Sequence, residues 1–165
     1  MVFNQEQYYS AFIGFNETAI IIQTQSGNGL LAIDYMYQPH VLPLDIDDNM
    51  LGETLLKSLS SSRTLVLDSE EIIDFFDLTK GKERYENWVD YLHQSLDYKS
   101  KKALFKNMMS CSISLFNGMI EIAPSRHVKL HAWEGLDDDK TITLPLDSTS
   151  DEIGKGLRLA MSYCL

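Results

Sequence analysis

A short segment that occurs twice constrains the fold of this chain more than any other feature. Residues 42–45, Leu-Pro-Leu-Asp, recur 102 residues later as residues 144–147, and the match continues without a gap to Leu-Gly at 51–52 and Ile-Gly at 153–154. Each copy combines an extended stretch, a proline that suits a strand ending at a sheet edge, and a helix with glycine in its early part. We therefore expect two similar strand-to-helix corners with a structural role, in which the glycine lets each helix sit close against the sheet.

Most of the expected strands fall into two groups, and the last strand of each group overlaps one copy of the repeat. A further short strand, 64–67, is expected between the two groups. The expected strands span residues 11–15, 19–25, 30–37, 41–44, 64–67, 111–116, 119–123, 128–133 and 141–144. The segments 26–29 (Ser-Gly-Asn-Gly) and 117–118 (Asn-Gly) predict hairpin turns, because Gly and Asn accept positive φ. Pro124-Ser125 is expected to turn the chain once more.

Apolar residues at helical spacing predict about five helices. They start near Asp47, Asp68–Ser69, Thr79, residue 99 and Thr149. Thr149 and Glu152 also have the spacing of a capping box. At 165 residues the chain is expected to form one domain. We predict a single α/β domain of the α+β type over residues 1–165, with a mixed or antiparallel central sheet packed by about five helices.

Charge narrows the classes of function. The chain has 14 Lys and Arg against 24 Asp and Glu, a net charge of −10, which argues against binding nucleic acid through its phosphates. Residues 80–106 carry +3, so the remainder carries −13, and acidic residues gather in 45–77 and 134–139. Some of them suit helix N-termini, which favour negative charge. The alternative is an acidic surface that attracts a basic protein.

Signatures of catalysis or of a cofactor are weak. Residues 27–32 match the letters of a dinucleotide-binding motif, but a strand-like segment follows where that motif needs a helix. His127 and His131 are expected on one face of a strand roughly 13 Å apart, too far to share a metal ion. No serine-nucleophile motif or P-loop is present. We expect no catalytic residue, cofactor or metal, and a carboxylate pair acting as acid and base stays an alternative.

The two cysteines and the N-terminus indicate the compartment. Cys111 and Cys164 lie in apolar patterns, so each is expected to be a small core residue rather than a reactive thiol. No stretch approaches the length of about 18 apolar residues that spans a membrane, and no signal peptide is recognisable at the N-terminus. We therefore expect a cytoplasmic protein with reduced thiols and no membrane partner.

Several segments together resemble a known family. Residues 11–15 (Ala-Phe-Ile-Gly-Phe), 29–40, 59–63 and the repeated Leu-Pro-Leu-Asp resemble the CdiI family, immunity proteins of bacterial contact-dependent growth inhibition systems. The resemblance is strongest over about the first 65 residues and continues to the end. It implies a cytoplasmic protein that binds the C-terminal toxin domain of a cognate CdiA-type effector and blocks its active site or substrate path. Toxins of such systems are often nucleases, including tRNA-cleaving ones.

The family label carries over no binding residues, so the predicted partner-binding site rests on charge. A nuclease tends to have a basic cleft, which an acidic inhibitor can occupy. The predicted partner-binding residues are acidic: Asp68, Glu70, Glu71, Asp74, Asp77, Asp137, Asp138 and Asp139. Aromatic anchors are also needed, and the candidates, each equally suited to the core, are Tyr35, Tyr37, Tyr98 and Phe76. The alternatives are a small cytosolic hydrolase that uses a carboxylate pair and a housekeeping protein-interaction adaptor.

Overall fold

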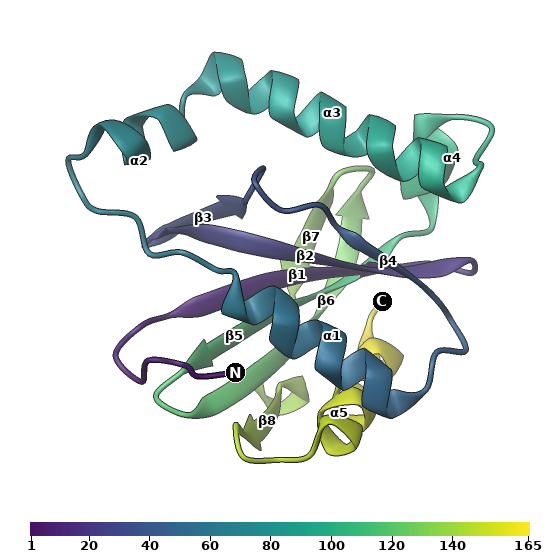
Figure 1. Ribbon diagram of the computed structural model, residues 1–165. Coiled ribbons are helices and arrows are strands. Elements are labelled where there is room, and N and C mark those ends of the chain that lie inside the picture. The colour runs from purple at the N-terminus through teal and green to yellow at the C-terminus, as the bar shows by residue number, and fades with distance from the viewer.

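An eight-stranded sheet with antiparallel ladders runs through the middle of the molecule (Figure 1). The computed structural model describes all residues, 1–165. The strand order is β3-β2-β1-β5-β6-β7, with β4 paired to β2 and β8 paired to β6. The strands are β1 (Tyr9–Phe15), β2 (Ala19–Asn28), β3 (Leu30–Ile33), β4 (His40–Pro43), β5 (Met109–Phe116), β6 (Met119–Lys129), β7 (Ala132–Gly135) and β8 (Ile142–Pro145).

Five α-helices pack on the sheet, as the sequence predicts. They are α1 (Asp48–Ser60), α2 (Glu70–Phe75), α3 (Leu78–Leu96), α4 (Lys101–Lys106) and α5 (Ser150–Tyr163), with a 3-10 turn, η1 (Asp138–Lys140). Every α-helix begins at a side chain that accepts a backbone N–H, which supplies a partner for an otherwise free donor. The capping box predicted for Thr149 and Glu152 is present. None of these helices is both long and apolar enough to cross a membrane.

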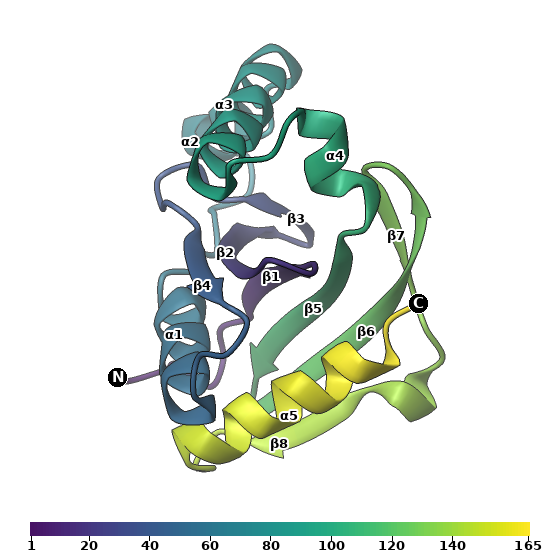
Figure 2. The same ribbon diagram turned by 90° about the vertical axis from the view of Figure 1, so that its right-hand side faces the viewer.

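Two cores form because side chains alternate between the faces of a strand. Ile20 and Ile22 of β2 are buried in the core that includes α1 and α5, whereas Ile21 between them is buried against α3 and α4. Figure 2 shows α1 and α5 on one side of the sheet and α3 and α4 on the other. Trp88 of α3 and Phe105 of α4 are buried in the second core.

The internal repeat extends well beyond the Leu-Pro-Leu-Asp motif. The register of β2 with β4 pairs Ile20 with Leu42, and that of β6 with β8 pairs Ile120 with Leu144. The strand order reads the same from either end, with β1 and β5 paired at the centre. The unit from β1 to α1 thus recurs from β5 to α5. The two predicted strand-to-helix corners are confirmed, and α2, α3 and α4 form an insertion between the two copies.

The repeated glycines hold the two equivalent helices together. A Cβ atom added to Gly52 would lie 1.9 Å from the carbonyl oxygen of Ser150, and one added to Gly154 would lie 1.9 Å from that of Asp48. Each glycine therefore packs against the start of the other helix. The close approach is present as predicted, but it joins helix to helix rather than helix to sheet.

Around the first hairpin one predicted strand is shorter than expected and another is wrong. The strand predicted at 30–37 ends at Ile33, because Asp34 is fully buried and its backbone N–H donates to the carbonyl of Thr24. The segment 64–67 forms no strand; Thr64 makes one isolated parallel bridge to Gly27. Interactions with distant residues decide both outcomes, so local strand propensity does not reveal them.

The second hairpin differs from the prediction at Pro124. The chain does not turn there; β6 continues to Lys129, and the turn lies at residues 130–131. Pro124 lies opposite Cys111 in the ladder with β5. On the other edge of β6, pairing with β8 ends at Ile122 and pairing with β7 begins at Ser125, so the missing N–H of proline interrupts neither of those two ladders.

Candidate partner-binding face

The predicted acidic residues fall into two separate groups. Five of them lie within the segment 66–78, which comprises α2 with its flanks and is called here the acidic face: Asp68, Glu70, Glu71, Asp74 and Asp77. The other three, Asp137, Asp138 and Asp139, are exposed at η1 between β7 and β8. Figure 2 places that connection at the opposite end of the molecule from α2. The structure therefore brings the first group together and leaves the second apart.

An ion pair between partly exposed Arg63 and buried Asp34 fastens the acidic face to the sheet. The Arg63 guanidinium donates to both carboxylate oxygens of Asp34, from Nε to Oδ2 at 2.7 Å and from Nη2 to Oδ1 at 3.1 Å. Ser26 also donates to Asp34, at 2.6 Å. Arg63 continues to Glu71 of α2, with 2.7 Å between Nη1 and Oε1. The hydrogen bond to Asp34 raises the pKa of Arg63, so this link between sheet and α2 stays charged.

A second ion pair joins α2 to α3. The Asp74 carboxylate accepts hydrogen bonds from Lys80 and from Arg84, the latter at 3.0 Å. These two donors, Lys80 first, hold the pKa of the Asp74 carboxyl below its usual value. Glu71 and Asp74 are therefore already paired with Arg and Lys side chains of the protein itself. By contrast, Asp68 and Glu70 are exposed and take part in no ion pair, so their charges are available to a partner.

Apolar side chains are interleaved with these carboxylates. Val66, Leu67, Ile73 and Leu78 are exposed by 61–91%. Single exposed apolar residues are ordinary, but four within the 13 residues of the acidic face form a surface that gains free energy when a partner covers it. Sequence reasoning assigned apolar residues here to strand and helix interiors and so missed this surface.

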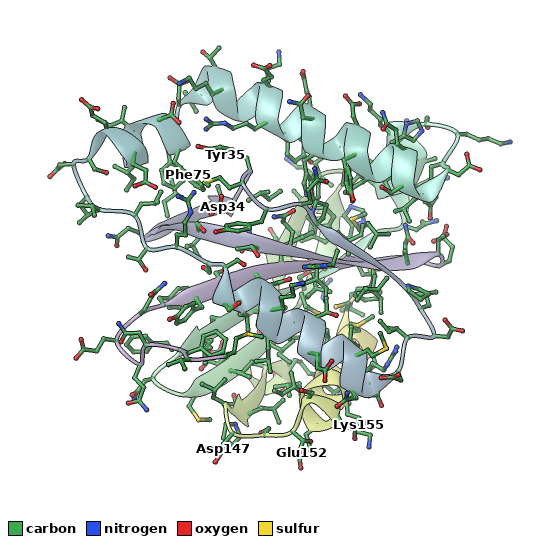
Figure 3. All side chains as sticks on the ribbon, viewed as in Figure 1. Asp34, Tyr35, Phe75, Asp147, Glu152 and Lys155 are labelled. Atoms are coloured by element: carbon green, nitrogen blue, oxygen red, sulfur yellow. The ribbon has the colours of Figure 1, made fainter.

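A cavity opens beside the acidic face, under the N-terminal half of α3. Its volume is about 360 Å³. It is lined by the end of β3, by the segment between β3 and β4, by Phe75 of α2 and by α3. The lining residues are Ala32, Ile33, Tyr35, Tyr37, Gln38, Pro39, Phe75, Gly81, Arg84, Tyr85, Asn87, Trp88 and Tyr91. Figure 3 shows Tyr35 and Phe75 in the space between the sheet and the helices α2 and α3.

Aromatic rings dominate the walls of this cavity. The guanidinium carbon of Arg84 lies 3.6 Å from the centre of the Tyr35 ring, within the range of a cation–π contact. Tyr35, Tyr37, Tyr85 and Tyr91 are each 36–44% exposed, so their rings are partly covered and partly open to solvent. Burial raises the pKa of Tyr85, whose hydroxyl contacts Nδ1 of His131 at 3.0 Å.

The four suggested aromatic anchors have different surroundings. Tyr35 and Tyr37 line the cavity. Phe76 packs edge-on against Phe75, with 4.9 Å between ring centres. Tyr98 packs against the second core, and its hydroxyl bonds to that of Thr18 at 2.9 Å, so it has a structural role. Sequence reasoning did not use the signal for this cavity, which is the spacing of Gly81, Arg84, Tyr85, Trp88 and Tyr91 along one side of α3.

The two cysteines are neighbours, which their spacing in sequence did not reveal. Cys111 is buried, as predicted, and Cys164 is half-buried, with 3.5 Å between the Sγ atoms. A hydrogen bond from the Cys111 thiol lowers the pKa of Cys164 to about 7, and the pKa of Cys111 is raised. We therefore expect Cys164 to be the more reactive of the two thiols.

The histidines do not form a metal site. His127 lies on β6 with its ring stacked on Trp133, whereas His131 lies in the turn before β7, so the predicted common strand face does not exist. No three His, Cys, Asp or Glu side chains gather closely enough to hold a metal ion.

Comparisons with known proteins find matches that cover nearly the whole chain. The family model of CdiI, CDI immunity protein, matches residues 9–164. Immunity protein CdiI-YPIII of Yersinia pseudotuberculosis serotype O:3 (strain YPIII) is 37% identical over 166 residues, covering 93% of this chain and 94% of that protein.

Two solved structures share the fold. A protein of unknown function from Neisseria meningitidis, NMB0488, has a TM-score of 0.97 and 55% identity over 100% of both chains. A chain of the CdiA-CT/CdiI toxin and immunity complex from Yersinia pseudotuberculosis has a TM-score of 0.86 and 36% identity over 96% of this chain and 98% of that chain.

Proposed function

The chain belongs to the CdiI family of CDI immunity proteins, and we propose from this that it binds and neutralises the C-terminal toxin domain of a cognate CdiA-type effector. The observation that carries the proposal is the match to a chain of a CdiA-CT/CdiI toxin and immunity complex over 96% of this chain. A match of that extent includes the insertion α2–α4 as well as the repeated halves.

We place the toxin on the acidic face. Asp68 and Glu70 present charges without internal partners, and Val66 and Ile73, on either side of them in the chain, offer exposed apolar surface. This combination suits a basic protein, because opposite charge speeds encounter while buried apolar contacts keep the complex together. A basic toxin in turn suits a nuclease, which must attract phosphate, and tRNA cleavage is one such activity. Asp137, Asp138 and Asp139 form the alternative contact surface, which applies if the toxin does not bind the acidic face.

Neutralisation on this proposal needs no catalysis. Three of the five carboxylates of the acidic face already have structural partners: Glu71 bonds to Arg63, Asp74 to Lys80 and Arg84, and Asp77 to a backbone N–H. The protein would act by covering the active site or substrate path of the toxin, in the cytoplasm where such a nuclease finds its substrate. A purified sample that hydrolyses ester, phosphate or nucleotide substrates, and loses that turnover through one Asp→Asn change, would instead favour a hydrolase.

Co-expression with the toxin domain encoded beside this gene tests the proposal. We expect cells that make both proteins to grow, cells that make only the toxin to stop, and the two proteins to co-purify. The toxin domain from the Yersinia complex is the specificity control, since its immunity protein is only 36% identical to this chain. Growth arrest despite expression of the folded protein would contradict the proposal, and co-purification of a chromosomal protein in its place would favour an adaptor.

A further inference from the structure

The cavity beside the acidic face has the properties of a pocket for a partner side chain. Its volume of about 360 Å³ is at the lower end of the range of cavities that hold small ligands, about 300–1,000 Å³. Four half-exposed tyrosines surround buried walls formed by Phe75 and Trp88. Binding energy in protein interfaces concentrates in such aromatic, water-excluding pockets.

The charges around the cavity restrict what can enter. Arg84 in the wall is already paired with Asp74 and stacked on the Tyr35 ring, so it offers no free charge to an incoming ion. The unpaired carboxylates of Asp68 and Glu70 lie just before and at the start of α2, the helix whose Phe75 lines the cavity. The interior therefore suits an uncharged apolar side chain, while the neighbouring acidic face suits a cation.

The position of the cavity in the repeat also points to a specific role. Two of its three walls, α2 and α3, belong to the insertion between the two copies of the repeat. The repeated halves supply the sheet and the packed pair α1 and α5. The cavity is thus a feature that the duplication alone does not create, and one of its lining residues, Phe75, lies on the same short helix as Glu70.

We propose that this cavity receives an apolar side chain of the toxin, with a Lys or Arg next to it in the toxin pairing with Asp68 and Glu70. The inference rests on the proposed function and adds the anchor point and its chemistry. The apolar anchor would supply most of the affinity, and the charges most of the association rate.

Gly81→Leu tests the anchor because it fills the cavity from within. Gly81 shares a helix side with Arg84, Tyr85 and Trp88, and a Cβ atom added to it meets nothing within 4 Å. The change also removes a helical glycine, so the variant should fold at least as well as the wild type. We expect its affinity for the toxin to fall by about tenfold or more, chiefly through faster dissociation.

Gly135→Leu is the matched control. It makes the same chemical change in strand β7, where an added Cβ atom also meets nothing within 4 Å. We expect its affinity to stay within about twofold of the wild type, as for a surface change outside the interface. Calorimetric titration of each variant with the toxin, and thermal melting to verify folding, complete the experiment.

The outcomes separate the two proposals. If wild-type protein does not bind the toxin, the proposed function itself fails. If it binds and Gly81→Leu binds equally well, the toxin is bound elsewhere and the anchor is overturned. If sedimentation shows a wild-type dimer that Gly81→Leu makes monomeric, with toxin affinity unchanged, the cavity holds a second copy of this chain and the proposal is likewise overturned.

Discussion

The carboxylate of Asp34 is completely buried, and both of its oxygens accept hydrogen bonds from Arg63, at 2.7 and 3.1 Å. Replacing Arg63 by Met would leave an uncompensated buried charge, so we expect unfolding free energy to fall by about 3 kcal/mol or more. The double variant Asp34→Asn with Arg63→Met should recover part of that loss, because it removes the charge as well. Urea denaturation gives the unfolding free energy of the two single variants and of the double variant. If the loss in the double variant equals the sum of the losses in the single variants, the two side chains are not a coupled pair.

The glycines of the helix pair give a second prediction. Gly52→Ala and Gly154→Ala would each place a Cβ atom 1.9 Å from a backbone oxygen of the facing helix, which must then move away. We expect each change to cost about 2 kcal/mol or more of unfolding free energy, and the two costs to be similar because the contacts are equivalent. Gly81→Ala, at an open helix position, should instead stabilise by about 0.5–1 kcal/mol. Thermal or urea unfolding compares all three, and a stable Gly52→Ala variant would contradict the close contact.

Charge reversal separates the two acidic groups. Asp68→Lys with Glu70→Lys changes only unpaired carboxylates, so the fold should be retained. We expect the rate of association with the toxin to fall by about tenfold at low ionic strength, and the difference to shrink as salt is added. Stopped-flow or surface-binding kinetics give the rate. Asp138→Lys with Asp139→Lys is the matched control. If this variant slows association with the toxin more than the first one does, the toxin binds at η1 rather than at the acidic face.

The thiol pair predicts a pH-dependent reactivity. Alkylation of Cys164 by iodoacetamide should rise with pH through about 7, because its thiolate forms there rather than near the ordinary value of 9.0. Cys111 should react far more slowly, since its pKa is raised and it is buried. Mass spectrometry of samples alkylated between about pH 5 and 9 locates the modified cysteine and the midpoint. With Cys111→Ala the midpoint should shift upward; an unchanged midpoint would show that Cys111 does not lower it.

Local signals predicted most of the elements of this fold. The cap at Asp47, the capping box at Thr149 and Glu152, and the Asn-Gly turn at 117–118 act within a few residues, so the sequence shows them directly. The Leu-Pro-Leu-Asp repeat revealed two corners but not the duplication behind them. Equivalent strands of the two copies differ in sequence. They share the same pairing register, Ile20 with Leu42 and Ile120 with Leu144, and only the structure displays this.

The errors arose where a distant partner decides the local conformation. The strand predicted at 30–37 ends at Ile33 because the buried Asp34 meets Arg63, 29 residues away. Pro124 stays within β6 because its strand changes partners there. At the candidate site, charge counting found the acidic face but did not show that Glu71 and Asp74 are already paired. It also missed the cavity, which needs the positions of three separate elements.

Hydrogen exchange of the protein alone and bound to the toxin tests the central claim most directly. If the acidic face and the cavity form the toxin-binding surface, amides in residues 66–78 and along α3 from Gly81 to Tyr91 should exchange more slowly in the complex. Those of residues 137–140 and of the pair α1 and α5 should change little. Protection confined to η1 and β7, with α2 unchanged, would contradict the account.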